Sequence, residues 1–379
     1  MEGTTFAHGS TGQRLALLVA SMRMGGAERM TVNLAGELAR RGHVVDLVLV
    51  ERTGPLLAEI PASVNVVDLG AKRARGAVRR LRRYLRAERP AALLSVAFQS
   101  NILAMTAMLG LRERPRTVLS VRNAYSATLA ANPPLTRMLL KVATSLLYPR
   151  ADWVVGIAKG TAEDLRRHAG LPAERVRAIY NPVLRPDFDQ LAAEPADPAI
   201  LGERSVPTII SAGRLTKQKD QATLIRAFAE LARRRPAKLL LLGEGELRPR
   251  LEALARELGV AERVALPGAL PNPFPYMREA DLFVLSSAWE GFGNVLVEAM
   301  ATGTPVISTD CPHGPREILE EGKWGALVPV GDHAKLAQAM ERALDTGGID
   351  PRPRAREFTV ERAADLYLDL MVGPASAAS

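Results

Sequence analysis

The sequence contains few of the residues on which disulfides, metal sites and nucleic-acid platforms depend. It has 1 cysteine and 5 histidines in 379 residues, and only 4 % of it is aromatic. The single cysteine, Cys311, excludes an internal disulfide and is typical of a reducing compartment. No aromatic stacking platform is visible, so nucleic acid is a poor partner. No cluster of His, Cys and Asp has metal-ligand spacing, so we predict no metal site.

Long apolar runs and targeting segments are absent as well. No run approaches the roughly 18 apolar residues of a membrane-spanning helix. Residues 1–13 lack a basic stretch followed by an apolar core, so we expect no secretory signal there and interpret them as a loose tail. These absences favour a cytoplasmic protein, with peripheral binding at the inner face of the cell membrane as the open alternative.

Positive charge is concentrated in the N-terminal half. The net charge is +9, and residues 1–190 hold 28 Lys and Arg against 15 Asp and Glu, a balance of +13. We therefore expect this half to meet an anionic partner. Residues 72–90 carry nine of these basic residues and one glutamate, which favours an anionic membrane surface.

A second segment with membrane character covers residues 132–151. Arg137, Lys141 and Arg150 accompany its long apolar face, and such a helix can lie in a membrane interface. For both segments the alternative is a helix that packs its apolar stripe into the core and leaves its basic face in water.

Short apolar runs alternate with amphipathic helical patterns along most of the chain. This alternation predicts an α/β fold with parallel sheets that helices cover on both faces. The expected strands cover 15–20, 44–50, 64–69, 91–98, 117–121, 152–158 and 175–180, and then 208–213, 238–245, 263–268, 282–287, 304–309 and 325–330.

The chain is longer than a usual single domain. A stretch rich in Pro, Asp and Ala interrupts the pattern, so we predict domains over 1–190 and 207–357 with a linker over 191–206. Both domains are expected to be doubly wound and to face a central cleft, where ligands bind beyond the carboxyl ends of the strands.

A glycine-bearing turn between two glutamates indicates a ligand site in the second half. In "EGFGNVLVE" (Glu290–Glu298), Gly291 and Gly293 allow a sharp turn close to a ligand. The helix that begins near Asn294 directs N–H groups and a positive dipole end at that ligand, which favours phosphate. Glu298, one turn into the helix, suits a pair of ribose hydroxyls. The alternative is a capped helix with two solvated glutamates.

Two further strand ends carry polar residues. Arg214 and Lys219 follow the strand that ends at Gly213, and two cations there can clamp a diphosphate; the alternative is a solvated basic loop. Gly243 and Glu244 follow the next strand in "LLGEGELRP". This turn lacks the full G-x-G-x-x-G pattern, so a dinucleotide site is poorly supported.

These motifs, in this order, resemble the retaining glycosyltransferases of family 4. The matching runs are G-R-L-x-x-x-K, G-E-G and E-G-F-G-N-x-L-x-E-A-M-A-x-G-x-P-V, and "GGAER" (Gly25–Arg29) and "YNPV" (Tyr180–Val183) extend the resemblance over most of the chain. The family has the two-domain GT-B fold and uses nucleotide-sugar donors. The resemblance implies an N-terminal acceptor-binding domain and a C-terminal donor-binding domain, with the last helix, 358–372, crossing back onto the first.

The resemblance also implies roles for single residues. Arg214 and Lys219 would hold the donor diphosphate and stabilise the leaving nucleotide, and Glu290 would bind hydroxyls of the transferred sugar. Glu298 would bind the ribose. The other donor-binding candidates are Gly25, Gly26, Gly213, Gly243, Glu244, Phe292, Gly293, Asn294 and Val295.

Other positions are candidates for contact with sugar or acceptor. "CPHGPREI" is similar to bacterial members that use UDP-linked GalNAc, GlcNAc or galactose, and it contains His313. Many relatives have a His in the N-terminal domain where this sequence has Arg122 and Asn123. Asn181 belongs to the "YNPV" run. Residues 187–189, "DFD", look like a metal-binding Asp-x-Asp, but they fall beside the linker and we interpret them as chance.

We therefore expect a retaining GT-B glycosyltransferase that moves a hexose or N-acetylhexosamine from a UDP-sugar to a lipid-linked glycan, without cofactor or metal. Two alternatives remain at this point. One is a nucleotide-sugar 2-epimerase or phosphorylase with the GT-B fold. The other is a protein that binds UDP-sugar and transfers nothing.

Overall fold

A computed structural model describes residues 12–23, 25–71, 74–202 and 205–373, so most of the expected N-terminal tail lies outside the described residues. The chain divides into two compact units, one of residues 1–182 and 360–379 and one of residues 183–359. The first boundary therefore falls ahead of the expected residue 190, and the expected linker 191–206 belongs to the second unit.

The first unit contains a seven-stranded parallel sheet in the order β3-β2-β1-β4-β5-β6-β7. Each strand matches an expected run. The strands are β1 (Arg14–Val19), β2 (Val44–Leu49), β3 (Val64–Asp68), β4 (Ala92–Val96), β5 (Arg116–Val121), β6 (Trp153–Gly156) and β7 (Val176–Ala178). The helices are α1 (Gly26–Arg40), α2 (Ala74–Glu88), α3 (Phe98–Met108), α4 (Tyr125–Ala130), α5 (Pro134–Leu147), α6 (Lys159–Ala169) and α16 (Val360–Val372), with short 3-10 turns at Pro55–Glu59, Tyr148–Arg150 and Ala173–Arg175.

Alternating side chains of β1, an inner strand of this sheet, fill two separate cores. Leu15 and Leu17 of β1 join the core that α1 and α16 cover, whereas Ala16 and Leu18 join the core that α2 and α3 cover. Because successive residues of a strand point to opposite faces, a strand covered on both faces is apolar throughout. This explains why the sequence shows continuous apolar runs here and not an alternating pattern.

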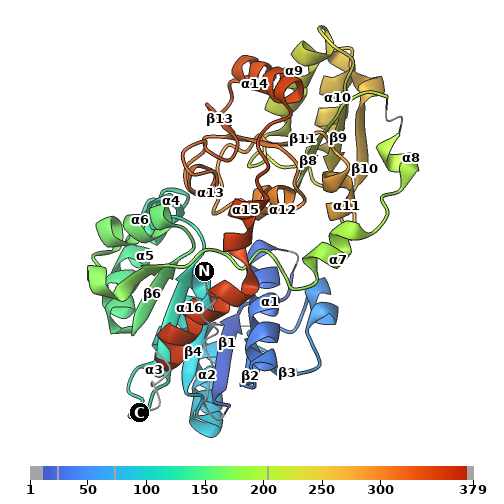
Figure 1. The fold of residues 1–379 in the computed structure, drawn as a ribbon. Coiled ribbons are helices and arrows are strands. Elements are labelled where there is room, and N and C mark those ends of the chain that lie inside the picture. The colour runs from blue at the N-terminus through green and yellow to red at the C-terminus, as the bar shows by residue number, and fades with distance from the viewer. Residues whose placement is uncertain (1–11, 24, 72–73, 203–204, 374–379) are drawn as a thin grey trace. The chain divides into compact units, whose positions relative to one another are not determined.

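The last helix, α16, belongs to the first unit although it comes after the whole second unit. It packs along α1 and β4 and is drawn in red in Figure 1. Tyr367 and Leu368 are buried there. The guanidinium of Arg41, just after α1, binds the Asp365 carboxylate and the Glu361 carbonyl oxygen.

The second unit contains a six-stranded parallel sheet in the order β10-β9-β8-β11-β12-β13, again from the expected runs. The strands are β8 (Thr208–Ala212), β9 (Lys238–Leu242), β10 (Val264–Gly268), β11 (Leu282–Leu285), β12 (Val306–Thr309) and β13 (Ala326–Val328). The helices are α7 (Phe188–Ala193), α8 (Pro198–Leu201), α9 (Gln221–Ala232), α10 (Arg248–Glu257), α11 (Phe274–Arg278), α12 (Asn294–Ala301), α13 (Pro315–Ile318), α14 (His333–Thr346) and α15 (Arg352–Ala355), with 3-10 turns at Ala261–Arg263 and Arg356–Phe358. α9 and α14 lie side by side on one face of this sheet.

The order of these strands places a ligand site. The chain runs from β8 outward to β9 and β10, then returns to β11 on the other side of β8. Connections that leave a parallel sheet in opposite directions open a crevice at the carboxyl ends of the two strands between them. In the second unit these two strands are β8 and β11, and the place where they lie side by side is here called the switch point of the second sheet.

Candidate active site

The loops that follow β8 and β11 hold the three residues predicted to be catalytic. Arg214 and Lys219 lie between β8 and α9, and Glu290 lies between β11 and α12. Hydrogen bonds join the two loops: the Ala288 N–H donates to the Gln218 carbonyl oxygen at 2.8 Å, and Ser286 Oγ donates to the Lys219 carbonyl oxygen at 2.9 Å.

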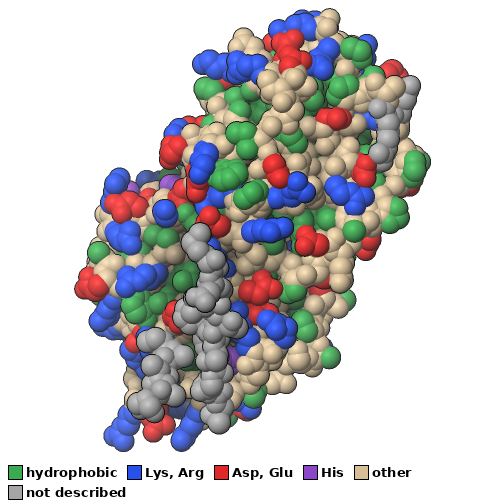
Figure 2. Space-filling view, in the orientation of Figure 1, with side chains coloured by type: hydrophobic (Ala, Val, Ile, Leu, Met, Phe, Trp, Pro, Cys, Tyr) green, Lys and Arg blue, Asp and Glu red, His purple; other side chains and the backbone are tan. Residues whose placement is uncertain are grey.

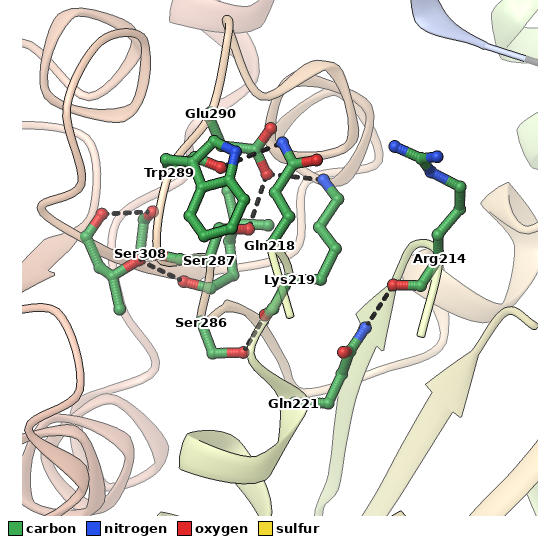
Figure 3. Close-up of polar contacts among 11 residues, drawn as sticks. Arg214, Gln218, Lys219, Gln221, Ser286, Ser287, Trp289, Glu290 and Ser308 are labelled. Atoms are coloured by element: carbon green, nitrogen blue, oxygen red, sulfur yellow. Dashed lines mark hydrogen bonds and ion pairs between the residues drawn. The ribbon is translucent and has the colours of Figure 1, made fainter. Parts of the chain in front are cut away.

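Lys219 and Glu290 form an ion pair. Lys219 Nζ lies 2.6 Å from Glu290 Oε1, and the two side chains are 16 % and 7 % exposed. Ser287 Oγ donates to the same oxygen at 2.6 Å. A carboxylate held by a cation and a hydroxyl in a poorly solvated site keeps a fixed orientation. Figure 3 shows both contacts.

Arg214 differs from Lys219 in having its charge unpaired. Its guanidinium makes no hydrogen bond or ion pair within the described part of the chain, and the side chain is exposed. Its backbone is fixed, because Gln221 Nε2 donates to the Arg214 carbonyl oxygen at 3.0 Å. In Figure 3 the Arg214 and Lys219 side chains extend in the same direction from their loop. The second unit therefore presents one neutralised and one available cation at the switch point.

The N-terminus of α12 follows Glu290 by four residues. Its N-cap is Gly293, at φ 104°, which brings no side chain to accept from the first N–H groups of the helix. The neighbouring loop comes very close, since a Cβ at Gly314 would lie 1.8 Å from the Phe292 carbonyl oxygen. An anion can therefore take the capping position on α12. Val295 lies in its first turn and Glu298 one turn further along.

The turn that follows β9 lies next to the turn that follows β8. Gly243 has φ 145°, and a Cβ there would lie 2.0 Å from the Gly213 carbonyl oxygen, so this crossing requires glycine. Glu244 Oε1 is 2.6 Å from Arg248 Nη1, which places it in an ion pair of its own.

The loop after β12 supplies His313, half-buried with φ 63°, and the buried Cys311. Burial, and secondarily the Glu290 charge, raise the pKa of the Cys311 thiol to about 12. The thiol is therefore neutral at physiological pH and a poor nucleophile.

The remaining candidates, Gly25, Gly26, Arg122, Asn123 and Asn181, lie in the first unit. Gly25 is the N-cap of α1 and Gly26 its first residue. Arg122 follows β5, and its Nη1 atom is buried without a hydrogen-bond partner among the described residues. Desolvation lowers the pKa of Arg122 to about 10, against the opposing influence of Tyr367 and Glu28, so it remains a cation at neutral pH. Asn123 is exposed and Asn181 buried.

The Asp-x-Asp run has a local role. Asp187 Oδ1 accepts from Arg185 Nε at 2.8 Å, and the residue is the N-cap of α7. Among the described residues, no three His, Cys, Asp or Glu side chains lie close enough together to hold a metal ion.

Sequence reasoning missed the polar residues that hold the ion pair. Ser286 and Ser287 carry no motif of their own, and Gln218 and Gln221 resemble any polar loop residue. Gln218 Nε2 donates to the Trp289 carbonyl oxygen at 3.1 Å. Their one signal is position, since Ser286 and Ser287 come at the end of the β11 run and Gln218 and Gln221 lie in or next to the loop that joins β8 to α9.

Comparisons with known proteins agree with these motifs. A family model described as "Glycosyltransferase Family 4" matches residues 24–183, and one described as "Glycosyl transferases group 1" matches residues 206–346. Among curated proteins, the N-acetylgalactosamine-N,N'-diacetylbacillosaminyl-diphospho-undecaprenol 4-alpha-N-acetylgalactosaminyltransferase of Campylobacter jejuni is 34 % identical over 59 % of this chain and 60 % of its own length. The lipopolysaccharide core biosynthesis glycosyltransferase LpsE of Rhizobium meliloti is 37 % identical over 44 % of this chain and 49 % of its own length. The chain thus matches between about half and two thirds of the length of such relatives.

Solved structures share the fold along nearly the whole chain. A sucrose-phosphate synthase from Thermosynechococcus elongatus has a TM-score of 0.79 at 21 % identity, with 96 % of this chain and 100 % of that chain covered. The HepE protein of Anabaena, solved in complex with UDP, has a TM-score of 0.76 at 22 % identity with the same coverage.

Proposed function

Because the chain belongs to the GT-B glycosyltransferases of the family 4 and group 1 type, we propose that it transfers a hexose or N-acetylhexosamine from a UDP-sugar to a lipid-linked glycan, with retention of configuration. One observation carries the proposal. At the switch point of the second sheet, the cations Arg214 and Lys219, the carboxylate Glu290 and the N-terminus of α12 lie on two adjoining loops.

The donor diphosphate binds between Arg214 and the first turn of α12. The Arg214 guanidinium is available to both phosphates, and the α12 N–H groups stabilise the phosphate nearer the helix. As the sugar departs, negative charge grows on the diphosphate. Arg214 and Lys219 then stabilise the transition state more than the ground state, which is what lowers the barrier. In this proposal the two cations replace a metal ion.

Glu290 holds the transferred sugar. Both of its described contacts, from Lys219 Nζ and Ser287 Oγ, go to Oε1, so Oε2 is the oxygen that accepts from sugar hydroxyls. Glu298 accepts from the ribose hydroxyls further along α12. The two glutamates bind opposite ends of one donor, with the diphosphate over the helix N-terminus between them.

The acceptor proposal rests on the relatives and on the first unit. The name of the Campylobacter protein gives a diphospho-undecaprenol acceptor, and the Rhizobium protein acts in lipopolysaccharide core biosynthesis. In the first unit, Arg122 is a half-buried cation whose Nη1 atom is buried without a hydrogen-bond partner among the described residues, which fits the phosphate of a lipid-linked acceptor. Such an enzyme would work at the inner face of the cell membrane.

A thermal-shift screen of nucleotide sugars identifies the donor. At 100 times its Kd, a true donor adds about 2.7 kcal/mol to the free energy of unfolding. Turnover of that donor is then measured with and without a lipid-linked acceptor. We expect turnover to require the acceptor. Turnover without it would favour an epimerase, turnover with phosphate a phosphorylase, and binding without any turnover a sugar-nucleotide sensor.

A further inference from the structure

Helix α5 exposes an unusual amount of apolar surface. Eleven large apolar side chains are exposed in the described part of the chain, and five of them belong to this one helix. Their exposed fractions are 67 % for Leu135, 56 % for Met138, 58 % for Leu139, 52 % for Val142 and 57 % for Leu146. The other six are spread singly, which is normal for a protein surface.

The five side chains form one continuous stripe, here called the α5 apolar face. They recur at i, i+3, i+4, i+7 and i+11, a spacing that keeps them within about 100° around the helix. The opposite side of α5 faces the core, where Thr144 is buried and Leu140 and Leu147 pack against the cluster that α2 and α3 line. A surface helix ordinarily puts charge on its outer side, and α5 puts leucine, methionine and valine there.

The charges that accompany this face are all basic. No Asp or Glu occurs from residue 132 to residue 151, and Arg137, Lys141 and Arg150 are the charged residues. Lys141 is exposed on α5 itself. α2 contacts α3, which in turn contacts α5, so the exposed Arg79 and Arg83 of α2 belong to the same helical layer. Figure 2 shows hydrophobic side chains among basic and some acidic ones over the region that Figure 1 labels α5 and α6.

The other basic segment, α2, has a different role from the one its charge suggests. Leu81 and Leu85 are buried in the core, so α2 offers no apolar face to a membrane. Arg80 donates to the Leu69 and Gly70 carbonyl oxygens, and Arg82 to those of Ala107 and Leu109. Part of its charge therefore holds loops of the first unit in place.

We propose that the α5 apolar face inserts into the interfacial region of an anionic lipid bilayer, with Lys141 and the exposed arginines of α2 binding lipid phosphates. An interfacial helix combines an apolar face with flanking basic residues in this way. A second copy of the chain fits less well. A two-fold pair would bring two such faces together, and the exposed Lys141 beside each face would add like charges to the interface. The inference rests on the proposed function only in one respect, since a lipid-linked acceptor explains why the enzyme would be at a membrane. Vesicle binding itself needs neither donor nor acceptor.

The test uses the full chain and vesicles of phosphatidylcholine, alone or mixed with phosphatidylglycerol, without any nucleotide sugar. Wild type is expected to sediment with the mixed vesicles, and less as salt rises, because screening shortens the reach of the charges. Leu139→Gln/Val142→Gln is expected to lower the partition coefficient about tenfold or more, because two apolar side chains no longer leave water on binding. Both residues are exposed, so the variant keeps its core.

Leu366→Gln is the matched control. Leu366 is an exposed leucine of the same unit, on α16, at 42 %, and its substitution should leave vesicle binding unchanged. A dye on Leu139→Cys reports insertion directly, because the native Cys311 thiol is buried and unreactive. Its emission should shift to the blue on the mixed vesicles, and a dye on Leu366→Cys should not respond.

Three results would overturn the proposal. In the first, the wild type does not bind either kind of vesicle at low salt. In the second, the double variant binds the mixed vesicles as strongly as the wild type does. In the third, the wild type is a dimer that Leu139→Gln/Val142→Gln disperses, which would assign the face to a second copy. Calorimetric titration with UDP separates this test from that of the proposed function, since the double variant should bind UDP as wild type does.

Discussion

At the scale of single residues, the Lys219–Glu290 pair has a consequence for stability. Removing one member of a poorly solvated pair leaves the other charge without compensation. Lys219→Met should therefore lower the free energy of unfolding by about 3 kcal/mol. Lys219→Met/Glu290→Gln should recover most of that loss, because no buried charge remains. Urea unfolding of the two single variants and the double variant measures this, and losses that simply add would show that the pair is not coupled.

Arg214 should affect catalysis without affecting stability, since its guanidinium has no described partner. Arg214→Ala is expected to lower kcat on the order of 10²-fold, as the loss of one preorganised donor to a developing charge does. Arg233→Ala, which removes an exposed arginine just after α9 in the same unit, should leave kcat unchanged. Initial rates at saturating donor decide this, and full activity of Arg214→Ala would remove the residue from the mechanism.

Glu298 should act on nucleotide binding. Its ribose contact is the same in ground and transition states, so Glu298→Ala raises KM more than it lowers kcat. Hydrogen bonds to a charged group contribute about 1.5–3 kcal/mol, which predicts a Kd for UDP at least about tenfold weaker. Glu257→Ala on α10 is the control. Calorimetry with UDP measures both variants, and an unchanged Kd for Glu298→Ala would exclude the ribose contact.

Not every residue of the candidate site was predictable from the sequence. Arg214, Lys219 and Glu290 stand out because charges that follow buried strands have few structural reasons to be there. Ser287 does not stand out, since a serine becomes significant only when its hydroxyl is seen to reach Glu290. The electrostatic environment of Arg122 includes Tyr367, which comes more than two hundred positions later in the chain.

At the scale of elements, α16 offers a stability test on two neighbouring positions. Leu368 is 2 % exposed and Leu366 is 42 % exposed. The same substitution therefore removes buried side-chain atoms at one position and solvent-exposed atoms at the other. Leu368→Ala should lower the free energy of unfolding by about 2–4 kcal/mol, whereas Leu366→Ala should change it by less than about 1 kcal/mol. Equal losses in chemical denaturation would contradict the docking of α16 in the first unit.

The two basic segments show what helical periodicity leaves open. Residues 72–90 and 132–151 both have an apolar stripe and several cations, and the sequence predicts a helix in each. Periodicity identifies the stripe but not its direction, which depends on the neighbours that the fold brings. In α2 the stripe faces the core of the first unit, whereas in α5 the core and the neighbouring helices take the opposite side and leave the stripe exposed.

At the scale of the whole molecule, the strands were predictable and their order was not. Each expected run forms a strand, because parallel strands covered on both faces must be apolar throughout. The two compact units divide at residue 182, whereas the sequence pattern predicted a boundary at residue 190, and α7 and α8 lie in the second unit over part of the expected linker. No helix of the described residues is long and apolar enough to cross a bilayer.

The proposed metal independence concerns the whole reaction. With Arg214 and Lys219 neutralising the diphosphate, transfer should continue at an unchanged rate in excess EDTA. The control is the same assay with EDTA and added Mg²⁺. Loss of activity in EDTA that Mg²⁺ restores would show that a metal ion and not the two cations balances the leaving group.

The central claim is that this chain transfers sugar from UDP with retention, using the switch point of the second sheet. The most direct measurement is the anomeric configuration of the fresh product by NMR, with the donor found by thermal shift and a lipid-linked acceptor. We predict an α-linked product from an α-configured UDP-sugar, formed by wild type and almost abolished in Arg214→Ala. A β-linked product, or no acceptor-dependent product from any UDP-sugar, would contradict the account.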